Sequence, residues 1–93
     1  MLRITVKTKM DPRKVISSAL SYFGPSGIGL KEVSSDEANA VFQGAGGGIE
    51  ISVSPDGAGA AVEAVSKEWD HQLKDYMGQL RRWKEGKGLP KPL

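Results

Sequence analysis

The chain of 93 residues contains no cysteine and a single histidine, His71. Without cysteine there is no disulfide framework, no zinc site built on thiolates and no thiol nucleophile. One histidine likewise excludes a site with several imidazole ligands. We therefore expect no metal and no cofactor. A chain without cysteine suits a reducing compartment, and we expect a cytoplasmic protein.

Long apolar runs are also missing. No stretch approaches the roughly 18 apolar residues of a membrane span. Residues 1–10 alternate apolar and polar side chains, unlike the continuous apolar core of a signal peptide. A chain of this length supports one small hydrophobic core. We expect a single soluble domain over residues 1–85, without membrane contact, followed by a flexible C-terminal tail over residues 86–93.

What the sequence does contain is clear periodicity. Apolar and polar residues alternate over residues 2–8, 38–43 and 49–54, which predicts strands. Residues 28–33 predict another strand, with an imperfect alternation that would suit a bulge. Asp11 and Pro12 are typical of a helix start, and Gly24 with Pro25 ends that short helix after Phe23.

A second, longer helix is predicted over residues 66–85. Apolar residues recur there at steps of four, three, four and three, which places them on one helical face. They are Trp69, Leu73, Tyr76, Leu80 and Trp83. We expect this stripe to dock on the sheet and anchor the helix.

Residues 60–66 are compatible with two structures. They could extend the last helix backwards, or form a further strand. Gly57 and Gly59 would each cost about 1 kcal/mol inside a helix, which favours the strand. The order is then strand, helix, three or four strands, helix. This order predicts an α+β domain with an antiparallel sheet, covered by a short N-terminal helix and a long C-terminal helix.

The chain resembles a minimal helix-grip domain in three features. They are this order of elements, Asp11-Pro12-Arg13-Lys14-Val15 at the start of the first helix, and Glu68-Trp69-Asp70 at the start of the second. The helix-grip fold is that of the START and polyketide-cyclase group, also described as TATA-binding-protein-like. The resemblance implies a small hydrophobic ligand held under the last helix. In so short a chain, its own side chains are expected to fill most of that space. The ligand-facing or core residues would be Phe42, Trp69, Leu73, Tyr76, Leu80 and Trp83.

The remaining polar motifs do not predict catalysis. Gly44 to Gly48 could suggest a phosphate loop, but Ile49 stands where the dinucleotide motif needs a third glycine, so a hairpin loop is favoured. His71 has Asp75 one turn away, on the polar side of the expected helix. Four carboxylates could in principle act as general acids or bases, but we expect them to be solvated. They are Glu32, Asp36, Glu37 and Glu50. We expect no catalytic residue and no enzymatic activity.

Charge suggests one more function. Residues 1–14 carry five basic and one acidic side chain, residues 15–71 two basic and eight acidic, and residues 72–93 six basic and two acidic. Cations beside Trp83 could hold a nucleic-acid backbone and stack a base. Alternatively, these cations could complement the negative C-terminal end of the helix dipole, and we favour this interpretation. The residues concerned are Arg81, Arg82, Lys84 and Lys87.

The sequence therefore leaves three functions open. The leading one is a binding or interaction module, with a homodimer formed through an uncovered edge or face of the sheet. The alternatives are a carrier of a small hydrophobic ligand under the last helix, and a weak nucleic-acid-binding accessory domain that uses the basic chain ends.

Overall fold

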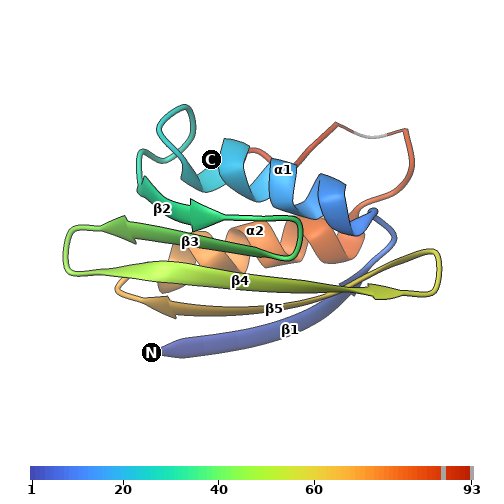
Figure 1. Cartoon of the computed structure of the whole chain (residues 1–93), viewed down its shortest axis with the longest axis horizontal. Helices are drawn as coiled ribbons and strands as arrows, with labels where there is room; N and C mark the ends of the chain where they lie inside the picture. Colours follow the sequence, from blue (N-terminus) through green and yellow to red (C-terminus); the bar gives the residue numbers. More distant parts are fainter. Residues whose placement is uncertain (87, 93) are drawn as a thin grey trace.

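The computed structural model describes residues 1–86 and 88–92. Its elements follow the predicted order and confirm the α+β class (Figure 1). They are β1 (Leu2–Thr8), α1 (Pro12–Phe23), β2 (Lys31–Ser35), β3 (Asn39–Gly44), β4 (Gly47–Asp56), β5 (Gly59–Lys67) and α2 (Asp70–Arg82).

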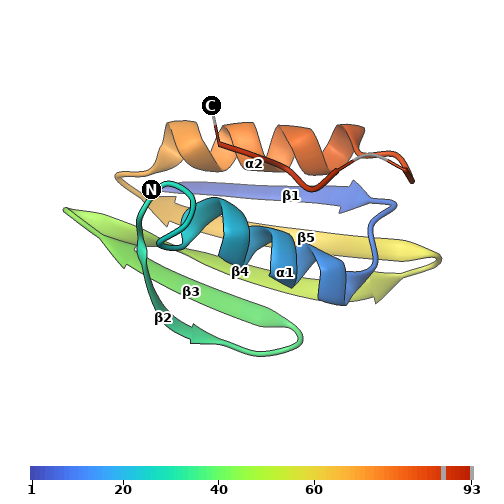
Figure 2. The ribbon, with the colours of Figure 1, turned by 90° about the horizontal axis from the view of Figure 1, so that it is seen from above.

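The strands form one antiparallel sheet in the order β1-β5-β4-β3-β2. The first strand crosses to the last one, with Leu2 opposite Ser66 and Thr8 opposite Ala60. Both helices lie on the same face of the sheet, α2 over β1 and β5 and α1 over β3, β4 and β5 (Figure 2). Neither of the two described helices covers the other face.

Residues 59–67 are a strand, as the glycines indicated, and this strand lies inside the sheet between β1 and β4. Val62, Ala64 and Ser66 point to the helices and are buried, whereas Glu63 and Lys67 are exposed on the other face. Gly59 also has a packing role, because a Cβ at this position would stand 2.0 Å from the carbonyl oxygen of Thr8.

The β3–β4 hairpin is tighter than predicted. The expected loop over Gly44–Gly48 is reduced to Ala45 and Gly46, since Gly44 and Gly47 already pair and Gly46 takes a φ of +79°. In the next hairpin β4 continues to Asp56 opposite Gly59. Gly57, with a φ of +59°, makes the reversal.

The first helix begins as predicted. The Asp11 carboxylate accepts the backbone N–H of Arg13 at 2.9 Å, and Pro12 occupies the first turn. The following strand is displaced towards the C-terminus: it runs over Lys31–Ser35, with the register shift between Glu32 and Ser34 that the imperfect alternation suggested. Leu30 is buried just before it.

The prediction of a long C-terminal helix over residues 66–85 is wrong. α2 has 13 residues, against 12 in α1. Ser66 and Lys67 pair within the sheet, and Glu68 has a φ of 68°, which interrupts the chain before the helix. Trp69 precedes the first turn, and Trp83 is already extended, with φ −64° and ψ 138°. The two tryptophans therefore flank the helix.

An aromatic cluster closes the core between the two helices and the sheet. The ring centroids of Tyr22 and Tyr76 are 5.1 Å apart, those of Phe23 and Tyr76 5.0 Å, and those of Phe23 and Phe42 5.5 Å. The Tyr76 hydroxyl donates to the carbonyl oxygen of Val15 at 3.0 Å and lies 2.7 Å from the Ser18 hydroxyl. The cluster thus joins α1 to α2 by both apolar and polar contacts.

Candidate functional site

The candidate site is a groove on the uncovered face of the sheet, near the β3–β4 hairpin. It has a volume of about 690 Å³. Its walls are outward side chains of β2 to β5, and we call it the sheet groove. The lining side chains used below are Val33, Val41, Glu50, Val65 and Lys67.

Three outward valines line the sheet groove. Val33 is 53% exposed, a high fraction for a large apolar side chain. Val41 and Val65 are half-buried and stand on β3 and β5, on either side of β4. Glu50 of β4 lies directly between these two valines in the sheet register. Gly48, two residues away on the same strand, forms the floor beside them, where a Cβ would lie only 2.3 Å from the carbonyl oxygen of Phe42. Close backbone packing therefore keeps this floor free of a side chain.

Charges of both signs lie among these valines. Glu50 and Lys67 line the sheet groove, from β4 and β5. Elsewhere on the sheet, Arg3 pairs with Glu63 at 3.4 Å and Lys7 with Asp56 at 3.6 Å. These pairs are exposed, so each contributes at most about 1 kcal/mol to stability. They nevertheless neutralise two of the basic residues near the N-terminus.

The sheet groove was not predicted, although the sequence contains a signal for it. Ala40-Val41-Phe42 and Ala64-Val65-Ser66 lie in strands, where neighbouring side chains point to opposite faces. The valine in each triplet stands between buried residues and must point away from the core. Apolar side chains at such outward positions indicate a contact surface.

The predicted ligand-facing residues are core. Phe42, Leu73, Tyr76 and Leu80 are at most 1% exposed, and Trp83 is 8% exposed. Trp69 is half-buried, and its ring lies close enough to Gly44 that a Cβ there would be 2.7 Å from its Cζ2 atom. The protein's own side chains thus occupy the space between sheet and α2.

The basic residues do not gather on one surface. Arg81 lies beside Ile4 and Val6, whereas Arg82 faces a second groove, between α2 and the C-terminal segment. Lys84 is exposed beyond the helix end, and Lys87 lies outside the described residues. Arg3 and Lys7 point from β1 to the uncovered face of the sheet, away from the helices. Lys14 lies over the Trp83 ring, with its Nζ 5.5 Å from the centroid.

The acidic candidates are exposed and serve turns and strands. Ala38 and Asn39 donate their backbone N–H groups to Asp36, which lowers the pKa of this carboxyl. The Glu32 carboxylate accepts the Ser35 hydroxyl at 2.9 Å. Within the described part of the chain, no group of three histidine or acidic side chains lies close enough to hold a metal. Neither described helix combines the length and the apolarity needed to cross a membrane.

His71 is exposed on the first turn of α2. We expect His71→Ala to change the free energy of unfolding by no more than about 0.5 kcal/mol, because an exposed side chain loses few contacts on truncation. Urea denaturation followed by circular dichroism measures this value. A loss of about 2 kcal/mol or more, the scale of a buried hydrogen-bond partner, would contradict the exposed placement.

Comparisons of the chain with protein-family models, with curated proteins and with solved structures give no significant match. Function is therefore argued from the chain's own geometry.

Proposed function

We propose that the protein is an interaction module that forms a homodimer through the uncovered face of its sheet. The observation that carries the proposal is the group of outward valines, Val33, Val41 and Val65, around the sheet groove. Apolar side chains collected in one concave patch are typical of contact surfaces, whereas isolated ones are common on any protein.

The charges of the sheet groove suit a second copy of the same chain. In a two-fold interface every contact occurs twice, because residue i of one protomer meets residue j of the partner and residue j meets residue i. Such an interface needs both signs of charge within one patch. Glu50 and Lys67 supply them on adjacent strands, with Glu50 opposite Val65 and Lys67 opposite Gly48 in the sheet register. Lys67 of one protomer can then meet Glu50 of the partner subunit, with the valines of both protomers beside this ion pair.

Sedimentation equilibrium of the full chain tests the proposal. We expect the apparent mass to rise from 9.9 kDa towards twice that value as the concentration increases. Val65→Lys should weaken the association by about ten-fold or more, because it replaces one of the contacting valines by a cation. Circular dichroism verifies that the variant is folded.

Ser52→Lys is the matched control. It adds the same side chain on the same face, at an exposed position of β4 outside the sheet groove. This variant should associate within a few-fold of the wild type. A wild type that remains at 9.9 kDa up to millimolar concentration contradicts the proposal. Equal dissociation of the two lysine variants also contradicts it, because charge alone would then explain the effect.

Three further assignments belong to the same proposal. The fold is a reduced helix-grip domain, supported by the β-α-β-β-β-β-α order and by the sheet packed on α2. The protein acts by binding, without catalysis, which the exposure of His71 and of Asp36 supports. It works in the cytoplasm, which the absence of cysteine supports.

A further inference from the structure

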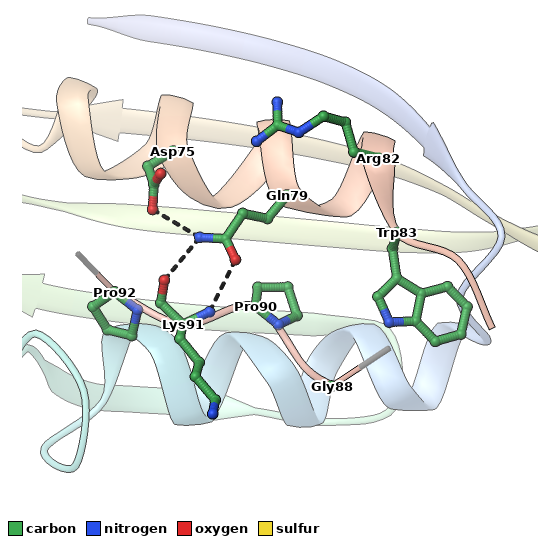
Figure 3. A pocket seen from close by; sticks show the side chains of 8 residues that line it. All are labelled: Asp75, Gln79, Arg82, Trp83, Gly88, Pro90, Lys91 and Pro92. Atoms are coloured by element: carbon green, nitrogen blue, oxygen red, sulfur yellow. Dashed lines mark hydrogen bonds between the residues drawn. The ribbon is translucent and has the colours of Figure 1, made fainter. Parts of the chain in front are cut away.

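The second groove lies along α2, and the chain's own C-terminal segment forms its other wall. Residues 88–92 run back along the helices after the chain turns beyond α2 (Figure 2). The helix side is lined by Asp75, Gln79 and Arg82, with Trp83 at the end, and open space of about 530 Å³ remains beside the segment (Figure 3). We call this region the helix groove.

The Gln79 side chain binds the backbone of the segment in both directions. Its Nε2 donates to the carbonyl oxygen of Lys91 at 2.7 Å, and the Lys91 backbone N–H donates to Oε1 at 3.1 Å (Figure 3). The second Nε2 hydrogen donates to Asp75 at 2.9 Å, which fixes the orientation of the amide. Because proline has no N–H, Lys91 carries the only backbone donor between Pro90 and Pro92. Gln79 therefore recognises the one N–H of a Pro-x-Pro sequence.

The side chains of the segment divide into two groups. Pro90 is buried and Leu89 packs on the edge of the core, whereas Lys91 is exposed. The side chain of Leu89 thus packs on the core and that of Pro90 lines the helix groove, whereas Lys91 is bound through its backbone. This division corresponds to the sequence Leu-Pro-x-Pro, in which x is free to vary provided that it keeps its N–H.

Trp83 leaves one hydrogen-bond donor in the helix groove unused. The side chain is 8% exposed, and its Nε1 atom is buried without an acceptor among the described residues. In Figure 3 the nitrogen lies on the side of the ring that faces the C-terminal segment. Indole N–H groups that are buried normally have a partner. Residues 88–92 line the helix groove but do not supply this carbonyl oxygen.

We propose that the helix groove is a binding site for an extended Leu-Pro-x-Pro segment of another protein, and that residues 88–92 occupy it as an internal competitor. Extended proline-rich segments bind well to aromatic-lined grooves because little conformational entropy is lost. The external segment makes the same two hydrogen bonds to Gln79. Because it is not tethered to α2 through the chain that follows Trp83, it can also place a carbonyl oxygen at Trp83 Nε1. Because the competitor is tethered, its local concentration is high and the apparent affinity for a free peptide is reduced.

The test uses the full chain and a fluorescent peptide of sequence Gly-Leu-Pro-Lys-Pro-Leu. Pro90→Asp places a carboxylate at a buried position of the tethered segment and should release it. We expect this variant to bind the peptide at least about ten-fold more tightly than the wild type does, since the competitor is removed. Lys91→Ala is the matched control, and it should bind like the wild type because the Lys91 side chain is exposed.

Two further changes test the assigned contacts. Adding Gln79→Ala to the Pro90→Asp variant should weaken peptide binding by about ten-fold, the effect of losing two hydrogen bonds. A peptide with proline at x should fail to bind, whereas alanine at x should be tolerated.

If Pro90→Asp does not fold, excess peptide added to the ¹⁵N-labelled wild type should shift the Lys91 amide and the Trp83 indole resonances. The proposal is overturned if the peptide neither binds the folded variant nor shifts those resonances. It is also overturned if the affinity is unchanged by Gln79→Ala and by proline at x.

Discussion

Tyr76→Ala should lower the free energy of unfolding by about 3–5 kcal/mol, the range for removing a buried aromatic ring. The side chain is fully buried and contacts the rings of Tyr22 and Phe23. Because these rings belong to α1 and Tyr76 to α2, the cavity would open where the two helices meet. Urea denaturation followed by circular dichroism measures the loss.

Two variants separate the ring from its hydroxyl and from helix propensity. Tyr76→Phe should cost only about 1 kcal/mol, because Ser18 Oγ also donates to the carbonyl oxygen of Val15, at 2.8 Å. Lys74→Ala, at an exposed position of the same helix, should cost less than about 0.5 kcal/mol. A loss below about 1 kcal/mol for Tyr76→Ala would mean that α2 does not close on α1.

The protein should also lose stability steeply above about pH 10, the ordinary pKa of a tyrosine phenol. The chain has two tyrosines, and both are buried. Burial raises the pKa of Tyr76, while burial followed by the hydrogen bond to Asp75 raises the pKa of Tyr22. The unfolded chain therefore releases these protons at a pH where the folded protein still holds them.

The sign and the slope follow from proton binding. The stabilisation is complete below the unfolded pKa and falls as the pH rises towards the folded pKa, by about 1.4 kcal/mol per pH unit for each tyrosine. With two tyrosines the slope is about 2.7 kcal/mol per pH unit. Absorbance at the tyrosinate band should rise in one cooperative step, together with the loss of circular dichroism.

Tyr22→Phe removes one of the two protons and should halve this slope. Phenylalanine keeps the ring contacts of α1 and loses only the hydroxyl that binds Asp75 and the carbonyl oxygen of Gln72. Ionisation of both tyrosines near pH 10 with the secondary structure intact would contradict their buried placement.

Much of this fold could be predicted because its signals are local. Alternation over residues 2–8 specifies which side of β1 is buried, and Asp11 with Pro12 starts α1 through contacts within one helical turn. The glycines at 57 and 59 correctly favoured a strand after them. Each of these features depends on neighbours along the chain.

The wrong predictions concern segments whose structure depends on pairing with strands that are distant in the sequence. Ser66 and Lys67 fit a helical stripe, yet they pair with Ile49 and Gly48 across the sheet. The β3–β4 hairpin loop is shorter than expected for the same reason, because strand pairing continues into glycines that local rules assign to the loop. Helical periodicity around Trp69 and Trp83 could not reveal that both side chains flank α2.

The candidate site was only partly accessible from sequence. An uncovered face could be expected once two helices had to share one side of a sheet, but its location required the strand order. Val33 lines the sheet groove because of the bulge in β2, and the alternation of apolar and polar residues does not specify where that bulge lies. The basic chain ends, in turn, are separated because β1 turns Arg3 and Lys7 away from the helix layer.

Dilution of the protein labelled with ¹³C in its valine methyl groups is the most direct test of the proposed contact face. Valines stand on both faces of the sheet, and on β5 they are three residues apart, with Val62 buried and Val65 outward. We expect the methyl resonances of Val33, Val41 and Val65 to shift between millimolar and micromolar concentration. Those of Val6, Val53 and Val62, which face the helices, should stay unchanged. If no valine resonance depends on concentration, or if only the inward valines shift, the uncovered face is not where this protein associates.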